Sequence, residues 1–369
     1  MKQSIDVAAY IWPAYSGREP RNHIFWPECR GEWETVERAQ AKFEGHQWPR
    51  KPLLGAQDEA DPKVMEEQIN LALSHGVNVF IYDWYWYDGR AFQEQCLNEG
   101  FLGASNCNQM KFYLMWANHH ANYVWDRRLS HDQKTVVWDG RVKEDVFREI
   151  GLRWIEKYFC LENYYRIDGK PVFAIYDLYN FISGLGSEEK AIELMNWLDT
   201  EAKARGLGGV HFQMVHYVPK ANRNASGVDG NGMTSYDLLL TKLPVSSVTH
   251  YQYCHFTNID RDYPTVMQDV VAEWNRLATL YPNIKYYPHV SLGWDNNPRY
   301  TELRPLILRE NTPENIEAAF RLAKEFAIKT NAPLVTVNSW NEWTEGSYLL
   351  PDDLYGYAYL DAVKSVFEE

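Results

Sequence analysis

Residues 334–348 read LVTVNSWNEWTEGSY, and this stretch decides both the fold and the chemistry that we expect of the chain. The apolar run 334–337 predicts a buried strand, and Glu342 and Glu345 follow it three residues apart. If the strand gives way to a helical turn, the two side chains face the same way. Two carboxyl groups that converge beside aromatic rings are typical of glycosidic bond cleavage. One protonates the leaving oxygen and the other acts as base or nucleophile.

A simpler interpretation of the acidic pair is a solvated first helical turn, in which the helix dipole favours glutamate. Trp340 and Trp343 flank Glu342, however, and Trp343 also lies between the two glutamates. Large indole rings seldom crowd a turn that is merely solvated. The flanking tryptophans therefore favour a functional pair.

Short apolar runs alternate with helical patterns from end to end, without a break in composition. About eight such alternations predict a parallel sheet closed into a (β/α)₈ barrel of the triosephosphate isomerase (TIM) type. We expect one catalytic domain, 1–369, with elaborated loops at 14–60 and 118–142 above the barrel. A doubly wound open sheet is the alternative, disfavoured because no Gly-rich G-x-G-x-x-G turn follows the first strand. The predicted strands are 7–12, 77–82, 111–116, 172–176, 210–215, 246–251, 286–292 and 334–337.

The bulk composition excludes several classes of protein. A net charge of −13 argues against a nucleic-acid-binding surface, and no stretch approaches the roughly 18 uncharged apolar residues of a membrane span. Lys2 and Asp6 stand where a signal peptide would be apolar. The chain as given is thus expected in the cytoplasm, or in the periplasm or outside the cell if a leader had been removed.

In a barrel of this type the chemistry lies at the C-terminal ends of the strands. Nearly every predicted strand end here carries an aromatic residue next to a hydrogen-bonding one, in a chain that is 15% aromatic. Flat rings suit the C–H face of a sugar, and carboxylates and amides bind its hydroxyl groups. Glu342 and Glu345 are the predicted catalytic residues. The predicted substrate-binding residues are Tyr10, Trp12, Asp83, Trp84, Trp86, Trp116, Asn118, His119, Asp177, His216, Tyr217, Tyr251, Trp294, Trp340 and Asn341.

No metal and no cofactor are expected. His119 and His120 are adjacent, but neither H-x-x-x-H nor H-x-H spacing supports a metal site. His216 and His250 are each interpreted as a hydrogen-bonded wall residue. Asp83 has a simpler interpretation too, as the cap of a following turn.

The five cysteines are odd in number and lack C-x-x-C spacing, which disfavours zinc. Cys96 and Cys107 are close enough in sequence for a loop disulfide. Acyl transfer is disfavoured, because there is neither a G-x-S-x-G elbow nor the setting of a nucleophilic cysteine.

Several segments in a fixed order carry a family resemblance over nearly the whole chain. The most specific is WNEWTEG at 340–346, followed by Pro351-Asp352 and by YGYAYL at 355–360. Weaker segments are Gly31-Glu32-Trp33, Gly45-His46, Leu54-Gly55, Trp116-Ala117-Asn118 and Gly169-Lys170-Pro171-Val172. Together they resemble the glycoside hydrolase family 99-like proteins, a grouping that includes the WbsX-type glycosyltransferases of polysaccharide loci.

The resemblance implies a (β/α)₈ barrel and retaining hydrolysis of an α-linked sugar, as typified by endo-α-mannosidases. It implies that Glu342 is the base that acts on the substrate's own 2-hydroxyl group, giving a 1,2-anhydro sugar intermediate. Glu345 would be the general acid and then the base for water. No enzyme carboxylate attacks the anomeric carbon, unlike in the usual retaining scheme. This chain has Thr344 where the endo-mannosidases usually have His, and His119 where WbsX-type sequences commonly have an acidic residue.

Three functions follow from these observations, with a glycoside hydrolase first. The second is a glycosyltransferase of surface polysaccharide biosynthesis, although nucleotide-sugar transferases ordinarily use Rossmann-like folds with a D-x-D site. The third is a non-catalytic glycan-binding barrel, for which the acidic pair would be dispensable. The expected partner is an oligosaccharide or polysaccharide substrate. The sequence leaves the sugar, the linkage, endo or exo action and the oligomeric state open.

Overall fold

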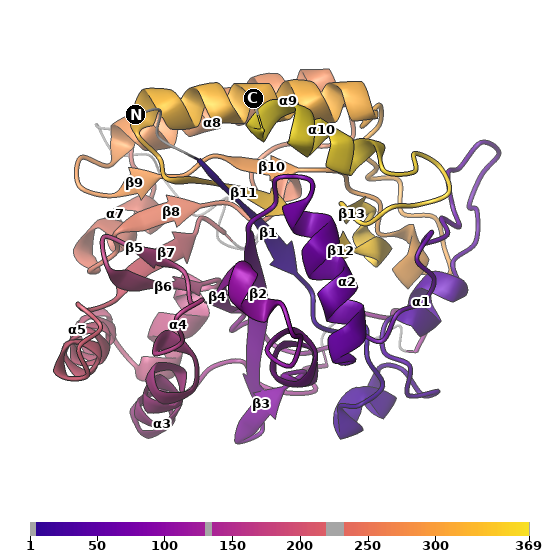
Figure 1. The fold of residues 1–369 in the computed structure, drawn as a ribbon. Coiled ribbons are helices and arrows are strands. Elements are labelled where there is room, and N and C mark those ends of the chain that lie inside the picture. Colours follow the sequence, from indigo (N-terminus) through magenta and orange to yellow (C-terminus); the bar gives the residue numbers. More distant parts are fainter. Residues whose placement is uncertain (1–4, 130–134, 219–231, 369) are drawn as a thin grey trace.

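The computed structural model describes residues 5–129, 135–218 and 232–368. Its centre is a curled parallel sheet, and helices cover the outside of the sheet (Figure 1). The predicted long loop 118–142 lies partly outside the described residues. The other predicted loop, 14–60, contains only short helical turns.

The parallel strands follow one another around the sheet in chain order. β1 (Asp6–Ile11) pairs with β2 (Val79–Tyr87) on one side and with β11 (Leu334–Asn338) on the other. The strands between are β4 (Lys111–Trp116), β6 (Lys170–Ile175), β7 (His211–Val215), β8 (Ser247–Thr249), β9 (Lys285–Tyr286) and β10 (His289–Ser291).

The barrel closes through a broken strand. β9 pairs with β8 and β10 pairs with β11, and only Tyr287 and Pro288 separate them. Hydrogen bonds continue through the break, from the Tyr287 amide to the Val248 carbonyl (2.9 Å) and from the Thr336 amide to the Pro288 carbonyl (3.0 Å). Pro288 has no amide proton to donate, which accounts for the interruption. With β9 and β10 counted as one strand, the described residues form eight, and the (β/α)₈ prediction is confirmed.

Side-chain caps mark the starts of several helices in the described residues. Asp61 caps α2 through the Lys63 amide, and Thr312 caps α9 through the Asn315 amide. The helices are α1 (Trp33–Glu37), α2 (Pro62–Leu73), α3 (Glu144–Trp154), α4 (Leu178–Leu185), α5 (Glu188–Ala204), α7 (Ser235–Lys242), α8 (Tyr263–Leu280), α9 (Pro313–Thr330) and α10 (Ala358–Phe367).

Short elements decorate the ends of the barrel. The short strands are β3 (Arg90–Phe92), β5 (Arg166–Ile167), β12 (Asn341–Glu342) and β13 (Ser347–Tyr348). The short helical turns are η1 (Pro20–Ile24), η2 (Cys96–Phe101), η3 (Cys107–Gln109), η4 (Ile155–Phe159), η5 (Tyr253–His255), η6 (Asn297–Arg299) and η7 (Trp343–Glu345).

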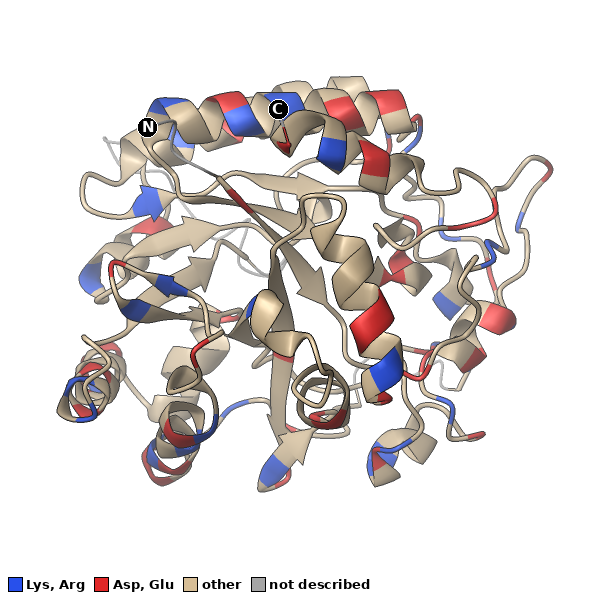
Figure 2. Ribbon diagram, in the orientation of Figure 1, with Lys and Arg blue, Asp and Glu red and all other residues tan. Residues whose placement is uncertain are grey.

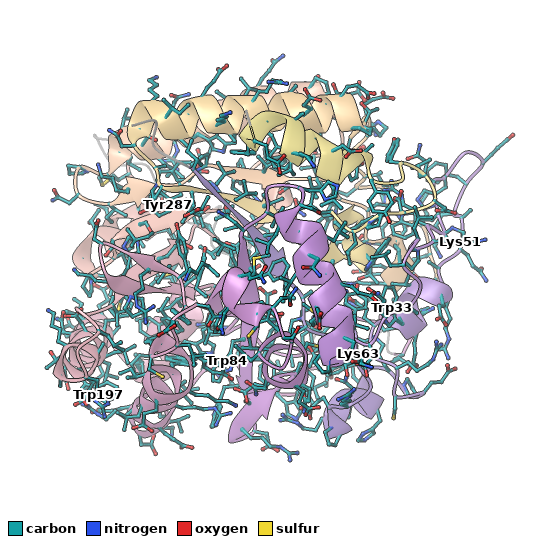
Figure 3. All side chains as sticks on the ribbon, in the orientation of Figure 1. Trp33, Lys51, Lys63, Trp84, Trp197 and Tyr287 are labelled. Atoms are coloured by element: carbon teal, nitrogen blue, oxygen red, sulfur yellow. The ribbon has the colours of Figure 1, made fainter. Side chains whose placement is uncertain are left out.

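Side chains fill the space between the strands and the surrounding helices (Figure 3). Charged residues lie mainly on the helices and loops, with both signs interspersed (Figure 2). All five cysteines are free thiols, so the loop disulfide between Cys96 and Cys107 is absent. No helix in the described segments combines the length and apolar character needed to cross a membrane.

Candidate active site

The acidic pair lies on a tight turn directly after the last barrel strand. Glu342 ends β12, and η7 carries Glu345 before the chain turns at Gly346, whose φ of +64° is a conformation that favours glycine. The turn is fixed from behind, because the Asp295 amide donates to the Glu345 carbonyl (2.6 Å). Both side chains are buried, with 4% of Glu342 and 9% of Glu345 exposed. Glu342 and Glu345 lie at the two ends of one short helical turn, Glu342 directly before it and Glu345 as its last residue.

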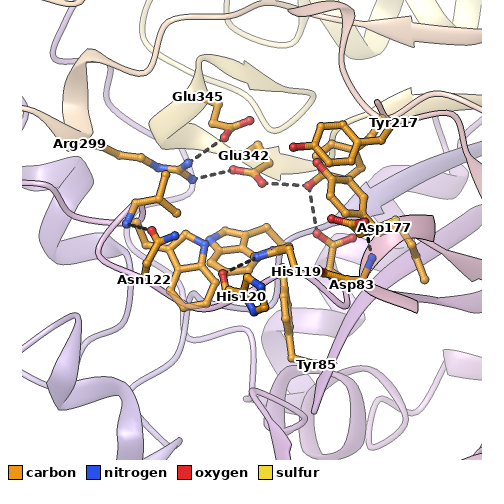
Figure 4. A pocket seen from close by; sticks show the side chains of 18 of the residues that line it. Asp83, Tyr85, His119, His120, Asn122, Asp177, Tyr217, Arg299, Glu342 and Glu345 are labelled. Atoms are coloured by element: carbon orange, nitrogen blue, oxygen red, sulfur yellow. Dashed lines mark hydrogen bonds and ion pairs between the residues drawn. The ribbon is translucent and has the colours of Figure 1, made fainter. Parts of the chain in front are cut away.

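A pocket of about 510 Å³ lies in front of this turn (Figure 4). It is formed where β1, β2, β4, β6, β7, β8 and β11 end, which is the face that carries the chemistry in TIM barrels. Its lining residues are Trp12, Asp83, Tyr85, Met115, Ala117, His119, His120, Asn122, Val124, Trp125, Tyr176, Asp177, Tyr179, Asn180, Tyr217, Tyr251, Arg299, Glu342 and Glu345.

Arg299 connects the two glutamates. Its Nη1 donates to Glu345 Oε1 at 2.7 Å, and its Nη2 donates to Glu342 Oε2 at 3.3 Å (Figure 4). The same Nη2 lies 3.2 Å from Glu32 Oε1, and Nε donates to Thr344 Oγ1 at 2.7 Å. One buried guanidinium therefore neutralises part of the charge of three buried carboxylates.

Burial dominates the ionisation of the pair. Desolvation raises the pKa of Glu342 well above its ordinary value, and the nearby Glu345 raises it further while Arg299 lowers it. Desolvation also raises the pKa of Glu345, against the lowering effect of Arg299. A carboxyl group with a raised pKa can hold a proton at neutral pH and deliver it.

A second link joins Glu342 to Asp83. The Tyr251 hydroxyl lies 3.0 Å from Glu342 Oε1 and 3.0 Å from Asp83 Oδ2 (Figure 4). One hydroxyl has a single proton to donate, so both contacts are hydrogen bonds only when one of the two carboxyl groups is protonated. Burial raises the pKa of Asp83 well above its ordinary value, which suits a shared proton.

The pocket brings together about half of the residues predicted from the sequence. Those in its lining are Trp12, Asp83, His119, Asp177, Tyr217, Tyr251, Glu342 and Glu345. The predicted residues outside its lining are Tyr10, Trp84, Trp86, Trp116, Asn118, His216, Trp294, Trp340 and Asn341.

The tryptophans outside the pocket follow from strand geometry. β2 continues to Tyr87, five residues beyond its predicted end, and so keeps alternating between the two faces of the sheet. Asp83 and Tyr85 thus line the pocket, whereas Trp84 packs against Trp154 of α3 with ring centroids 5.2 Å apart. Trp116 also packs against Trp154, at 5.4 Å.

Other predicted residues support the pocket from behind. Asn118 Nδ2 donates to the Asp177 carbonyl, and Asn118 Oδ1 accepts from the Asp177 amide. Asn341 pairs in the same way with the backbone of Trp12. The Tyr10 ring lies 4.7 Å from that of Tyr251, and the Tyr10 hydroxyl donates to a backbone carbonyl.

The remaining four predicted residues also lie outside the pocket. The Trp86 ring stacks on that of Trp84, with centroids 5.9 Å apart. Trp340 Nε1 donates to Gln68 (2.7 Å), His216 Nε2 lies 3.0 Å from Asp237, and Trp294 lines a separate cavity.

The substrate-binding residues predicted from the sequence do not include several lining residues. Tyr85 could have been found by following the period of two from Asp83 along a longer strand. Arg299 lies in a loop 43 residues before Glu342, and no local pattern marks it. The others are Met115, Ala117, His120, Asn122, Val124, Trp125, Tyr176, Tyr179 and Asn180.

One cluster has the residue types of a metal site. His216, His250 and Glu273 each offer a ligand atom, and within the described residues these atoms lie within 4.8 Å of one another. Arg276 already binds both Glu273 oxygens, at 2.7 and 2.8 Å. The carboxylate is thus neutralised by a guanidinium. In the pocket, His119 Nδ1 lies 3.0 Å from the His120 carbonyl and is held by the backbone.

Comparisons with known proteins agree with this architecture. The family model described as "Glycosyltransferase WbsX" matches residues 7–363. The chain belongs to this family. An uncharacterized protein WxcX of Xanthomonas campestris pv. campestris is 28% identical over 357 residues, which cover 94% of this chain and 47% of that protein. The chain thus spans about half the length of the curated relatives that it matches.

Solved structures share the fold. The GH99 endo-alpha-mannosidase from Bacteroides thetaiotaomicron superposes with a TM-score of 0.63 at 15% identity, covering 99% of this chain and 98% of that chain. A structure described as a glycoside hydrolase-like protein gives 0.62 at 17% identity, with 99% and 94% covered. The WbsX family member therefore has a GH99-like barrel.

Proposed function

We propose that this protein is a glycoside hydrolase that acts on α-linked glycans of manno configuration, with retention through a 1,2-anhydro sugar. The observation that carries the proposal is the pair Glu342 and Glu345. These are buried carboxyl groups on one turn, and they face one pocket and share Arg299 as a partner. The GH99-like barrel and the WbsX family membership support an enzyme that acts on glycans.

In the first step Glu342 removes the proton from the substrate's 2-hydroxyl group, and that oxygen attacks the anomeric carbon. Glu345 gives its proton to the glycosidic oxygen, so the leaving group departs as an alcohol and a 1,2-anhydro sugar forms. In the second step Glu345 takes a proton from water, which attacks the anomeric carbon and opens the three-membered ring. Glu342 returns its proton to the 2-oxygen, and two inversions give net retention.

This chemistry selects the sugar. The 2-oxygen must attack from the face opposite the leaving group, so the two substituents must be trans. In an α-linked hexopyranoside the 2-hydroxyl is trans to the leaving group when it is axial, as in manno configuration. The aromatic side chains of Trp12, Tyr85 and Trp125 in the pocket lining suit the C–H face of such a ring.

The test is incubation with a panel of α-linked manno-, gluco- and galacto-configured oligosaccharides, with the products followed by ¹H NMR. We expect cleavage of the manno-configured members and an α-anomer as the first product. The Glu342→Gln and Glu345→Gln variants serve as controls for contaminating activity. A first product of β configuration, or cleavage that both variants retain, would refute the proposal.

The name of the family favours a second candidate, a glycosyltransferase. The charge of the pocket argues against a nucleotide-sugar donor. Among the lining residues that the structure describes are four carboxyl groups, on Asp83, Asp177, Glu342 and Glu345, and a single arginine. That arginine is already bound by three carboxylates. A diphosphate would therefore meet like charges at close range. Calorimetric titration with nucleotide sugars tests this candidate, and tight binding would favour it.

A further inference from the structure

Arg299 is built into the site more firmly than a side chain that merely lines a pocket. It is 5% exposed, and its guanidinium contacts Thr344, Glu345, Glu32 and Glu342 at 2.7 to 3.3 Å. Each of its three nitrogens therefore has a carboxylate or hydroxyl partner. Because a guanidinium is planar and rigid, these contacts fix the relative position of its partners.

Glu32 holds Arg299 from the side away from the pocket. It is fully buried and is absent from the residues that line the pocket in the described part of the chain. Glu32 Oε2 accepts from Trp12 Nε1 (2.5 Å) and from the Tyr15 hydroxyl (3.1 Å), and Oε1 accepts from Thr344 Oγ1 (2.8 Å). With both oxygens engaged, Glu32 is placed to act on the glutamate pair through Arg299 and not on a substrate.

Opposite charges of this kind affect buried carboxyl groups strongly. Arg299 favours the ionised form of Glu342 and Glu345, whereas the negative charge of Glu32 favours their protonated form. The charged and titratable groups that face this cluster are Tyr15 and Glu32 from the N-terminal loop, Asp83 and Tyr85 on β2, His119 after β4, Tyr176 after β6, Tyr251 after β8, Arg299 after β10, and Glu342 and Glu345 after β11.

We propose that Arg299 and Glu32 are a positioning pair, which holds Glu342 and Glu345 in place and sets the balance of charge under which one is protonated while the other is ionised. The proposal rests on the function proposed above, since it assigns a task to residues of the same site. Neither residue is predicted to be functional by the sequence analysis. Their task is electrostatic and geometric, and neither exchanges a proton with substrate.

The decisive test is a pair of substitutions with opposite effects on the pH dependence of kcat/KM. Arg299→Met removes the cation, which raises the pKa of both glutamates, so both limbs of the profile should move to higher pH by about one unit or more. Glu32→Gln removes an anion, which lowers both pKa values, so both limbs should move to lower pH. The limbs report macroscopic values of the coupled set of carboxyl groups.

A third variant separates charge from geometry. Arg299→Lys keeps the positive charge but loses the rigid fork, so the profile should stay near its original pH while kcat falls about 10- to 100-fold. Two matched controls carry the same chemical changes nearby. Arg304 lies in the same loop as Arg299, and its guanidinium stacks on Tyr300, so Arg304→Met is the control for Arg299→Met. Glu34 lies two residues from Glu32, so Glu34→Gln is the control for Glu32→Gln. Both should leave the pH profile unchanged.

The proposal of a positioning pair can be refuted independently of the proposed hydrolase function. If the protein cleaves no glycan, the titration of Glu342 and Glu345 is followed by ¹³C NMR of glutamate labelled at Cδ, with the Gln variants for assignment. Opposite shifts in Arg299→Met and Glu32→Gln would then uphold the pair while the hydrolase proposal fails. Shifts in the same direction, absent shifts, or full kcat in Arg299→Lys would overturn it. If Arg299→Met does not fold, the direction of the pKa shift in Glu32→Gln and the kcat of Arg299→Lys still test the proposal.

Discussion

Tyr251→Phe is the substitution that tests the link between Asp83 and Glu342 most directly. The change removes one hydroxyl and leaves the ring, which packs 4.7 Å from Tyr10 and 5.5 Å from Tyr176. The variant loses the single hydroxyl that lies 3.0 Å from Glu342 Oε1 and 3.0 Å from Asp83 Oδ2, and with it the one proton that this hydroxyl can donate to either carboxylate. Among the described residues Asp83 Oδ1 makes no hydrogen bond, and Tyr85 is the other side chain that favours the ionised form of Asp83.

The size of the effect follows from these two contacts. A hydrogen bond to a charged group contributes about 1.5–3 kcal/mol. If Glu342 needs this bond to act as base, losing it lowers kcat about 10- to 150-fold, because about 1.4 kcal/mol corresponds to a factor of ten. The lost donor also favours the protonated acid, so the acidic limb of the pH profile should move to higher pH.

The assay is steady-state kinetics on an α-mannoside between pH 4 and 9, together with thermal unfolding. Tyr253→Phe is the matched control, because Tyr253 is also buried but its hydroxyl lies near Met267 Sδ (3.3 Å) and the His289 carbonyl (3.4 Å), away from the glutamate pair. A Tyr251→Phe variant that keeps kcat and its pH profile within twofold of the wild type would show that the bridge has no part in the reaction.

Three further predictions concern the carboxyl groups. Glu345→Gln should slow substrates with poor leaving groups far more than activated aryl glycosides, whereas Glu342→Gln should slow both kinds of substrate alike. We expect each substitution to lower the rate by about 10²- to 10⁴-fold. Equal rates in the wild type and both variants would show that the pair is structural. A 2-deoxy or 2-O-methyl substrate should not turn over, and efficient cleavage of a 2-deoxy glycoside would rule out the 1,2-anhydro intermediate. Burial raises the pKa of Glu59 from 4.5 to about 8, so its proton is lost near pH 4.5 in the unfolded chain but only near pH 8 in the folded one. Glu59→Gln should therefore gain stability relative to wild type by roughly 1.4 kcal/mol per pH unit between pH 5 and 8, and a constant difference in urea unfolding would contradict this.

Local sequence patterns predicted most of the barrel because strands and helices leave short-range marks. The predicted strand 111–116 coincides with β4, and the predicted strand 7–12 differs from β1 by one residue at each end. The predicted strand 286–292 is interrupted at Pro288, a position where a proline in a central strand argues for a break. In each case the deciding information lies within a few residues.

The site was less predictable because it depends on which side chains meet across the barrel. The end of β2 at Tyr87, and not at Tyr82, decides that Asp83 and Tyr85 enter the pocket while Trp84 leaves it. Arg299 reaches the glutamates from a loop that has no pattern of its own, so only the closed barrel places it there. The alternation of side chains along a strand can be predicted from neighbouring residues. The contacts of an arginine in a loop cannot, because they depend on the tertiary structure.

The burial of the acidic pair supports the proposed catalytic role of the turn over a merely solvated one. A glutamate that only stabilises a first helical turn keeps its charge in water, where the helix dipole contributes about 0.3–1 kcal/mol. Glu342 and Glu345 are instead removed from water, and desolvation raises both pKa values. Crowding them with Glu32 around one arginine, with Asp83 also near Glu342, opposes folding at neutral pH, because buried like charges destabilise the folded state. Residues held in such an unfavourable arrangement at the open end of a barrel fit proton transfer far better than a structural role.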